Sequence, residues 1–198
     1  MDAEGDKKIK DSEHYEVSFI NFSAYGATLA HLGKQGAPCT PLYNYLKPFP
    51  EEAKTLFSEK YGSLENWSKE TASPFLGMLN AGLQLFWLKN HKPSLFQQIH
   101  RTVFLPQYLS YVITGVLSTE YTGVGCHTGM WDFRKNDFHW WMYNEKLTGL
   151  LPEVIHSNIN FPVAGSYTRA GIGIHDSSAA LIPYSDTAIP QQLYRTRY

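Results

Sequence analysis

The chain has 198 residues, of which 43 % are hydrophobic and 15 % aromatic, so it is globular and long enough for one sizeable core. Its 17 basic and 18 acidic residues nearly cancel, which argues against a nucleic-acid partner, because binding to phosphates needs a basic excess. No apolar run reaches the length of a membrane span, and the polar start MDAEGDKKIKDS is not a signal peptide, so we expect no membrane association.

The two cysteines, Cys39 and Cys126, form no CxxC pair and have no metal-site spacing. A cytoplasmic, reduced setting fits them best. Cys126 and His127 with His139 lack the fourth partner of a zinc site, so we expect no metal.

The many aromatic rings suit either a large core or a carbohydrate site, where flat apolar faces stack on sugar rings.

The first predicted elements are extended. Residues 16–32, EVSFINFSAYGATLAHL, are rich in β-branched and aromatic side chains, and small residues interrupt them at 23–27. This pattern predicts a strand, a kink where another group approaches closely, and a second strand. A glycine-flanked turn follows at 33–36, and TPLYNYL then runs extended from Thr40. Together these segments predict a β-meander.

Helices are predicted after the extended segments. Pro50 suits the first position of one helix, because its missing N–H would have no partner there, and Gly62 ends that helix. A second helix is predicted over residues 76–90, where the apolar side chains share one face and Pro93 follows the end.

Two more helices follow in the middle of the chain. One is predicted over residues 106–114, starting at a proline and closed by Gly115. The other is predicted over residues 138–147, with Asp137 as its cap and Gly149 after its end.

The last predicted strand is short and apolar. Residues 171–174 read GIGI, His175 and Asp176 stand at the end of this strand, and the small-residue run SSAAL begins a helix. Strands, then several helices, then a strand running into a helix make an α/β pattern.

Asp176 is the residue with the clearest functional position. It follows a buried strand and opens a helix, which is where α/β folds place their ligands. A plain helix cap is the alternative, since an aspartate at that position is common without any catalytic role. The surrounding GIGIHD is not a dinucleotide-binding loop, because Asp176 replaces the third glycine, and the chain contains neither a GxxxxGKS/T phosphate loop nor a GxSxG elbow.

Four stretches, in the same order along the chain, resemble the FGGY family of carbohydrate kinases. They are INFSAYGATLAHLGKQGAPCTPLYNYLK, FLPQYLSYVITGVLSTEYTGVGCHTGMWDFRKNDFHWWM, LPEVIHSNINFPVAGS and GIGIHDSSAALIPY. They are similar to the family's sugar-contacting strands and hairpin, its proline-started helix with the turn and D…W segment after it, its linker, and the FGGY motif. The rhamnulokinase and fuculokinase-like branch is the most similar.

The resemblance implies an α/β, ribonuclease H-like domain of the actin-like ATPase superfamily, incomplete, with a mixed sheet and helices. It divides the chain into a polar segment at 1–15, a sugar-binding N-terminal domain at 16–170 without its first strands, and the start of a truncated C-terminal domain at 171–198. It implies ATP-dependent phosphorylation of a sugar hydroxyl, with MgATP as cofactor, a small sugar as the substrate, and a possible homodimer.

The resemblance also implies roles for particular residues. Asp176 matches the base that takes the proton of the sugar hydroxyl, and its neighbours His175 and Ser177 are expected to hydrogen-bond sugar hydroxyls. The other expected sugar-binding residues are Ala24, Tyr25, Gly26 and Asn44. Small residues let the backbone approach closely, and an amide both donates and accepts. For Tyr25 and Asn44, simple turn and sheet packing is the alternative.

The chain departs from the family at both ends. The family's phosphate-binding strand–turn–strand is expected before residue 16, and its second domain is expected after residue 184, but the sequence matches neither of them. The linker at 166–171 is short, and the tail SDTAIPQQLYRTRY is unlike the family. Three interpretations remain: an active sugar kinase, a domain without catalysis that binds sugar or pairs with a complementary chain, and a fragment without function. We expect the isolated chain to be inactive.

Overall fold

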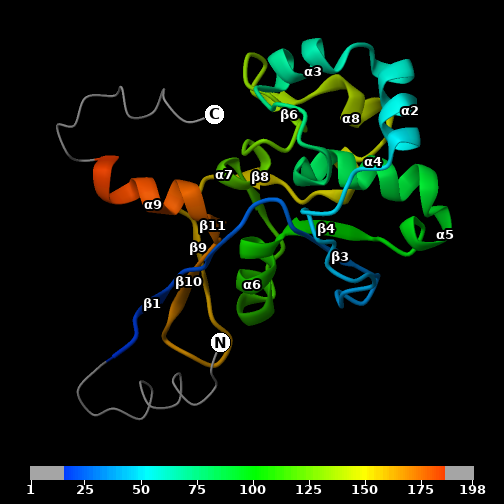
Figure 1. Cartoon of the computed structure of the whole chain (residues 1–198). Coiled ribbons are helices and arrows are strands. Elements are labelled where there is room, and N and C mark those ends of the chain that lie inside the picture. Colours follow the sequence, from blue (N-terminus) through cyan, green and yellow to red (C-terminus); the bar gives the residue numbers. More distant parts are fainter. Residues whose placement is uncertain (1–15, 186–198) are drawn as a thin grey trace.

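The structure of the protein, a computed structural model, describes residues 16–185 (Figure 1). The predictions for the polar segment 1–15 and for the tail from residue 186 onward lie outside these residues. Extended segments from the two ends of the described chain meet on one side of the molecule, and most of the helices gather on the other.

Two segments far apart in the sequence form parallel pairs. Strand β1, Phe19–Ile20, pairs with β10, Arg169–Gly171, and β2, Ser23–Ala24, pairs with β11, Ile174–His175. On its other side β10 pairs antiparallel with β9, Asn160–Pro162, in the strand order β1-β10-β9. The residues from 19 to 24 and from 169 to 175 therefore run side by side, with one interruption between the pairs.

The interruption has a local cause. The N–H of Gly173 donates to Oδ1 of Asn21 across 3.0 Å instead of to a strand carbonyl. Gly173 has a φ of +86°, which favours glycine, so the predicted single strand 171–174 is wrong: it is split into the end of β10 and the start of β11.

Helix α6, Leu105–Thr114, holds this split segment from one face. Nε2 of Gln107 donates to the carbonyl of Gly173 at 2.6 Å, and the Ser110 hydroxyl donates to the carbonyl of Gly171 at 2.8 Å. The predicted helix is confirmed, as is its end at Gly115, which has a φ of 72°.

The predicted β-meander is wrong. Strand β3, Leu29–Leu32, pairs antiparallel with β4, Arg101–Phe104, which the sequence analysis missed, and meets the following residues only in a single bridge from Leu32 to Pro38. Residues 40–46 form no strand. The reason is local turn chemistry, because Oδ1 of Asn44 accepts the N–H of Leu46 at 2.9 Å and bends the chain.

The helices between these strands begin as the capping residues dictate. Helix α2, Glu51–Tyr61, is confirmed, with Pro50 directly before it and Gly62 after it. Helix α3, Leu64–Thr71, which the sequence analysis missed, is capped by the Ser63 hydroxyl.

The predicted helix 76–90 is replaced by the short η1, Gly77–Leu79, and by α4, Ala81–His91. The side-chain amide of Asn80 divides them, since it accepts the N–H of Leu76 at 2.6 Å and donates to the carbonyl of Pro74 at 3.0 Å. Helix α5, Pro93–Phe96, follows.

The predicted helix 138–147 is mostly wrong. Asp137 is not its cap but part of strand β7, Asp137–Phe138, which pairs with β6, Trp131–Asp132. Helix α8 covers only Trp140–Asn144 and is capped by His139. The remaining elements are β5, Thr119–Glu120, α7, Tyr121–Val124, η2, Thr148–Leu150, β8, Val154–Ile155, and α9, Asp176–Ser185.

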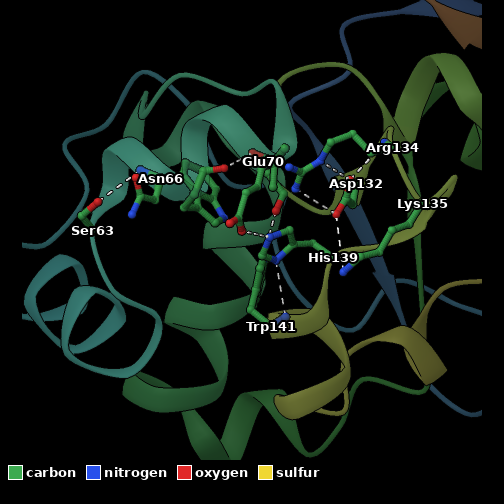
Figure 2. A network of polar contacts seen from close by, with 11 residues as sticks. Ser63, Asn66, Glu70, Asp132, Arg134, Lys135, His139 and Trp141 are labelled. Carbon is green, nitrogen blue, oxygen red and sulfur yellow. Dashed lines mark hydrogen bonds and ion pairs between the residues drawn. The ribbon is translucent and has the colours of Figure 1, made fainter.

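Figure 2 shows how His139 and Asp132 are held. Nε2 of His139 lies 2.8 Å from a carboxylate oxygen of Glu70 on α3, and its Nδ1 accepts the N–H of Trp141 at 3.5 Å. Asp132, only 1 % exposed, pairs with the exposed Arg134 and Lys135. These contacts tie the β6–β7 hairpin to α3 and α8, and they engage His139 with Glu70 rather than with Cys126 and His127.

The main core is aromatic. The ring of Phe57 on α2 is fully buried and meets Trp67, Phe86 and Trp141 edge-on, with centroids 5.1 to 5.6 Å apart. Such edge-to-face pairs add about 0.5–1.5 kcal/mol each beyond their burial. The large aromatic side chains around Phe57 therefore belong to the core, which is one of the two roles that the composition suggested for the aromatic rings.

One buried carboxylate joins three helical segments of the protein. Glu145, 4 % exposed, follows α8 and accepts hydrogen bonds from Lys60 and Tyr61 at the end of α2, at 3.0 and 2.5 Å, and from Lys89 of α4. Burial alone would raise the pKa of Glu145, but the hydrogen bonds from Lys89, Tyr61 and Lys60 outweigh it and hold this pKa below its usual value of 4.5.

Because the pKa of Glu145 is lowered in the folded state, its contribution to stability is present above the unfolded value and disappears as the pH falls through the folded value. We expect Glu145→Gln to lower the free energy of unfolding at pH 7 by about 1–3 kcal/mol. The loss of stability between about pH 5 and pH 3 should be shallower in this variant than in the parent. Urea unfolding across that range measures both effects.

The matched control is Glu65→Gln. The Glu65 side chain is 75 % exposed in its pair with Lys69, so this variant should change stability by less than about 1 kcal/mol. Equal pH profiles for Glu145→Gln and the parent would contradict the assignment.

Candidate functional site

The candidate site begins where β2 and β11 end. In the parallel register Ala24 lies opposite His175, so the next residues along the two chains are Tyr25 and Asp176. Carboxyl ends of parallel strands are where open α/β sheets bind their ligands. The fold therefore gathers two of the predicted site residues from positions 151 residues apart.

Asp176 is the first residue of α9, and its side chain is 51 % exposed. Oδ1 accepts the N–H of Ser177 at 2.7 Å and lies 3.4 Å from the Ser177 hydroxyl. An ordinary cap reaches the N–H two or three residues further on. The carboxylate is thus oriented by its immediate neighbour and remains accessible to a ligand.

His175 is buried next to Asp176. It is only 4 % exposed, and its N–H donates to the Thr122 hydroxyl at 2.9 Å. Gly26 packs directly on its ring: a Cβ at Gly26 would lie 2.3 Å from Cδ2 of His175. The close approach predicted around residues 23–27 is thus the contact between Gly26 and His175, while Ala24 holds the strand pair.

A buried carboxylate that the sequence analysis did not select supports this arrangement. Glu120 is fully buried and accepts the N–H groups of Thr122 and Gly123 at 2.7 and 2.5 Å, the Thr122 hydroxyl at 2.7 Å and the Ser157 hydroxyl at 2.8 Å. Its signal in the sequence is an acidic residue directly before a turn of helix. Through Thr122, Glu120 fixes the backbone of His175.

A pocket of about 370 Å³ opens beside Tyr25. Three tyrosines contribute to it, and the rings of Tyr25 and Tyr45 lie 5.7 Å apart. The lining residues are Tyr25, Thr28, Leu42, Tyr43, Asn44, Tyr45 and Leu46. Two of the expected sugar-binding residues, Tyr25 and Asn44, therefore line one pocket, and Asp176 is not among its lining residues.

A second, more apolar pocket of about 390 Å³ adjoins the first and shares Leu42, Tyr43 and Asn44 with it. The ring of Trp87 lines its wall and meets Tyr43 edge-on at 5.3 Å. Oδ1 of Asn44 is engaged in its own turn, and its Nδ2 group has no partner among residues 16–185. Asp176 lines neither pocket, but it follows the strand that pairs with the one leading into Tyr25.

Burial at the site favours the neutral form of the His175 ring. Burial lowers the pKa of His175, while the nearby carboxylates of Asp176 and Glu120 act in the opposite direction.

Among the described residues, no group of three or more His, Cys, Asp or Glu side chains is arranged to hold a metal ion. No helix within residues 16–185 is long and apolar enough to cross a membrane.

Comparisons with known proteins agree on one family. The model of the FGGY family of carbohydrate kinases, N-terminal domain, matches residues 6–188. A rhamnulokinase from Bacteroides thetaiotaomicron is 28 % identical over 106 residues, which cover 54 % of this chain and 21 % of that protein. An L-fuculokinase from Haemophilus influenzae is 36 % identical over 59 residues, which cover 27 % of this chain and 13 % of that protein.

Solved structures give the same fold. A carbohydrate kinase from Novosphingobium aromaticivorans matches with a TM-score of 0.79 and 21 % identity, over 95 % of this chain and 43 % of its own. A glycerol kinase from Plasmodium falciparum, solved with ADP, matches with a TM-score of 0.73 and 21 % identity, over 90 % of this chain and 38 % of its own. The chain thus spans less than half the length of these relatives.

These neighbours have the actin-like ATPase fold, so the predicted α/β class is confirmed, with a mixed arrangement of partial sheets in this chain. The two curated relatives also support the predicted rhamnulokinase and fuculokinase-like branch.

The contact between Gly26 and His175 gives a direct test of the site geometry. We expect Gly26→Ala to destabilise the fold by about 1–3 kcal/mol, because the new methyl group overlaps a buried ring. Chemical denaturation measures the loss. Gly149→Ala is the control, since a Cβ at Gly149 would meet nothing within 4 Å. Equal stability of the two variants would mean that His175 does not lie against Gly26.

Proposed function

The chain belongs to the FGGY family of carbohydrate kinases, and we propose that its described domain binds a sugar beside Tyr25 and presents one hydroxyl of that sugar to Asp176. The observation that carries this proposal is the register of β2 and β11, in which Tyr25 and Asp176 are the residues that follow the paired positions. The tyrosine-lined pocket begins at Tyr25.

The chemistry of the pocket suits a sugar. The rings of Tyr25, Tyr43 and Tyr45 offer flat apolar faces for the C–H face of a sugar ring. The amide Nδ2 of Asn44 donates hydrogen bonds to hydroxyls, while its Oδ1 stays in the turn. The branch shared with the rhamnulokinase and the L-fuculokinase supports a sugar similar to the substrates of those two enzymes.

Asp176 has the requirements of a general base. Its carboxylate is exposed, and the hydrogen bond from the N–H of Ser177 fixes its direction. A base in this position takes the proton of the sugar hydroxyl while that oxygen attacks a phosphoryl group. The Ser177 hydroxyl shares Oδ1 and lies close enough to contact the same sugar. In this proposal His175 is a buried neighbour of the base, whereas the sequence analysis predicts a direct sugar contact.

The described residues do not fit MgATP. The helix that begins at the site, α9, carries an acidic residue at its start, and a second carboxylate, Glu120, lies buried behind it. Both repel phosphates, and the rings of His127 and His175 have lowered pKa values because they are buried. We therefore assign the sugar side of the reaction to these residues and no step that involves the nucleotide.

Sugar binding without catalysis is the second candidate function, and a fragment without function is the third. Sugar binding without catalysis is favoured by the pocket at Tyr25. The boundary between a domain at 16–170 and a second domain that starts at 171 remains a prediction, as do the homodimer and the cytoplasmic setting.

We predict that the isolated chain binds sugar but does not phosphorylate it. Ligand-observed NMR against a panel of ketoses and deoxysugars should show binding, while coupled ADP release with MgATP should stay at background. Asn44→Asp keeps the acceptor of the turn but removes the amide donor, and it should weaken binding about tenfold. The exposed Asn66→Asp is the control and should change nothing. Turnover of about 1 per second or more in the isolated chain would refute this prediction.

A chimera tests the base. This domain would replace the matching domain of a related kinase, and Asp176→Asn would be introduced there. An amide preserves the shape of the side chain but cannot take the proton, so turnover should fall roughly 100-fold or more, while sugar affinity stays within a few fold. Near-normal turnover in the variant would exclude Asp176 as the base and leave its helix-start role.

A further inference from the structure

The turn between β2 and β3 carries two side chains of the tyrosine-lined pocket. Tyr25 and Thr28 line that pocket, and Gly26 packs on the ring of His175. Ala27, only 3 % exposed, lies between Gly26 and Thr28. The backbone of residues 25–28 therefore sets where Tyr25 stands relative to the end of β11.

A buried side-chain amide from α4 binds this turn. Gln84 is fully buried, and its Nε2 donates to the carbonyl of Ala27 at 2.8 Å and to the carbonyl of Met78 at 2.5 Å. The amide nitrogen carries two protons, so each proton has its own acceptor. Gln84 thus joins the turn at residues 25–28 to η1, which is distant from it in the sequence.

The partners leave one orientation for the Gln84 amide. If the amide were flipped, its oxygen would face two carbonyl oxygens, neither of which can donate. In the observed orientation Oε1 is buried and has no hydrogen-bond partner among residues 16–185. Burying an oxygen without a donor costs free energy, so the favourable contribution of this amide is its two hydrogen bonds to the backbone.

The other end of this bridge belongs to the second pocket. Met78 lines the more apolar pocket together with Trp87, which lies three residues after Gln84 on α4. Asn80 fixes the chain just after Met78, because its Nδ2 donates to the carbonyl of His127 at 2.7 Å. Gln84 itself lines neither pocket, so it acts on a ligand through the backbone that it holds.

We propose that Gln84 is a positioning residue for the sugar pocket, because its amide holds the turn at residues 25–28 against η1 and thereby fixes Tyr25 and Thr28 in place for a sugar. This proposal rests on the proposed function, since only there does the pocket bind sugar. The two hydrogen bonds from Gln84 to the backbone exist without any sugar.

Gln84→Met tests this role, because methionine has a similar length but no N–H donor. The turn should loosen, and the affinity for the best-binding sugar of the ketose and deoxysugar panel should fall about tenfold in ligand-observed NMR. Gln84→Lys should stay within about threefold of the parent, since the lysine nitrogen has at least two N–H groups for the two carbonyls. An unchanged affinity in folded Gln84→Met, or equal losses in the two variants, would overturn the proposal.

Phe57→Leu is the matched control for stability. It removes part of the aromatic core, and none of the ring contacts of Phe57 involves the turn at residues 25–28. It should lower the urea midpoint of unfolding but leave the sugar affinity within about twofold of the parent. A tenfold loss of affinity in this variant as well would mean that lost stability alone weakens binding, which would remove the specific role of Gln84.

Two measurements on the full, ¹⁵N-labelled parent chain decide the matter if Gln84→Met does not fold. The two Nε2 protons of Gln84 should give separate signals that exchange slowly with water, and sugar titration should shift them although Gln84 contacts no sugar. Rapid exchange, or signals that bound sugar leaves unmoved, would overturn this proposal alone. Slow exchange without any sugar binding would refute the proposed function and the positioning role with it, and would leave only the bridge between the turn and η1.

Discussion

The site depends on the hydrogen bonds that the buried carboxylate of Glu120 accepts. A charged group without water is stable only when its oxygens are fully hydrogen-bonded, so the fold has to bring donors to it from several segments. Two of these donors are N–H groups of α7, one is the Thr122 hydroxyl, and one is the Ser157 hydroxyl. Because Thr122 also accepts the N–H of His175, the satisfaction of Glu120 and the placement of the site are one network.

Elements with local signals in the sequence could be predicted, whereas elements that depend on distant or unmarked contacts could not. Helices α2 and α6 were predictable because proline and glycine mark their ends locally. Strand pairing was not, because β3 finds β4 about 70 residues away, and nothing in TPLYNYL shows that Asn44 bends that segment into a turn. The helix predicted over 138–147 failed because His139, engaged with Glu70, begins it later than the apolar pattern indicates.

The candidate site divides in the same way. Asp176 stood out because it follows an apolar strand, and Tyr25 and Asn44 came from the resemblance to the family; the pocket beside Tyr25 contains both of the latter. The supporting residues Glu120 and Thr122 were not selected, since a buried acid becomes informative only when its neighbours are known. For His175 the sequence analysis predicts a contact with ligand, whereas the structure buries it next to Asp176.

Gly173 restricts the substitutions that this sequence can tolerate. Its φ is +86°, and a Cβ there would lie 2.4 Å from the carbonyl oxygen of Pro106, so backbone strain and backbone collision exclude every larger residue together. Pro106 is in turn fixed at the start of α6. In a mutational library of this chain, Gly173 should be among the positions with the fewest surviving codons, although it contacts no sugar in the proposal, because it sets the path of Ile174, which leads into His175.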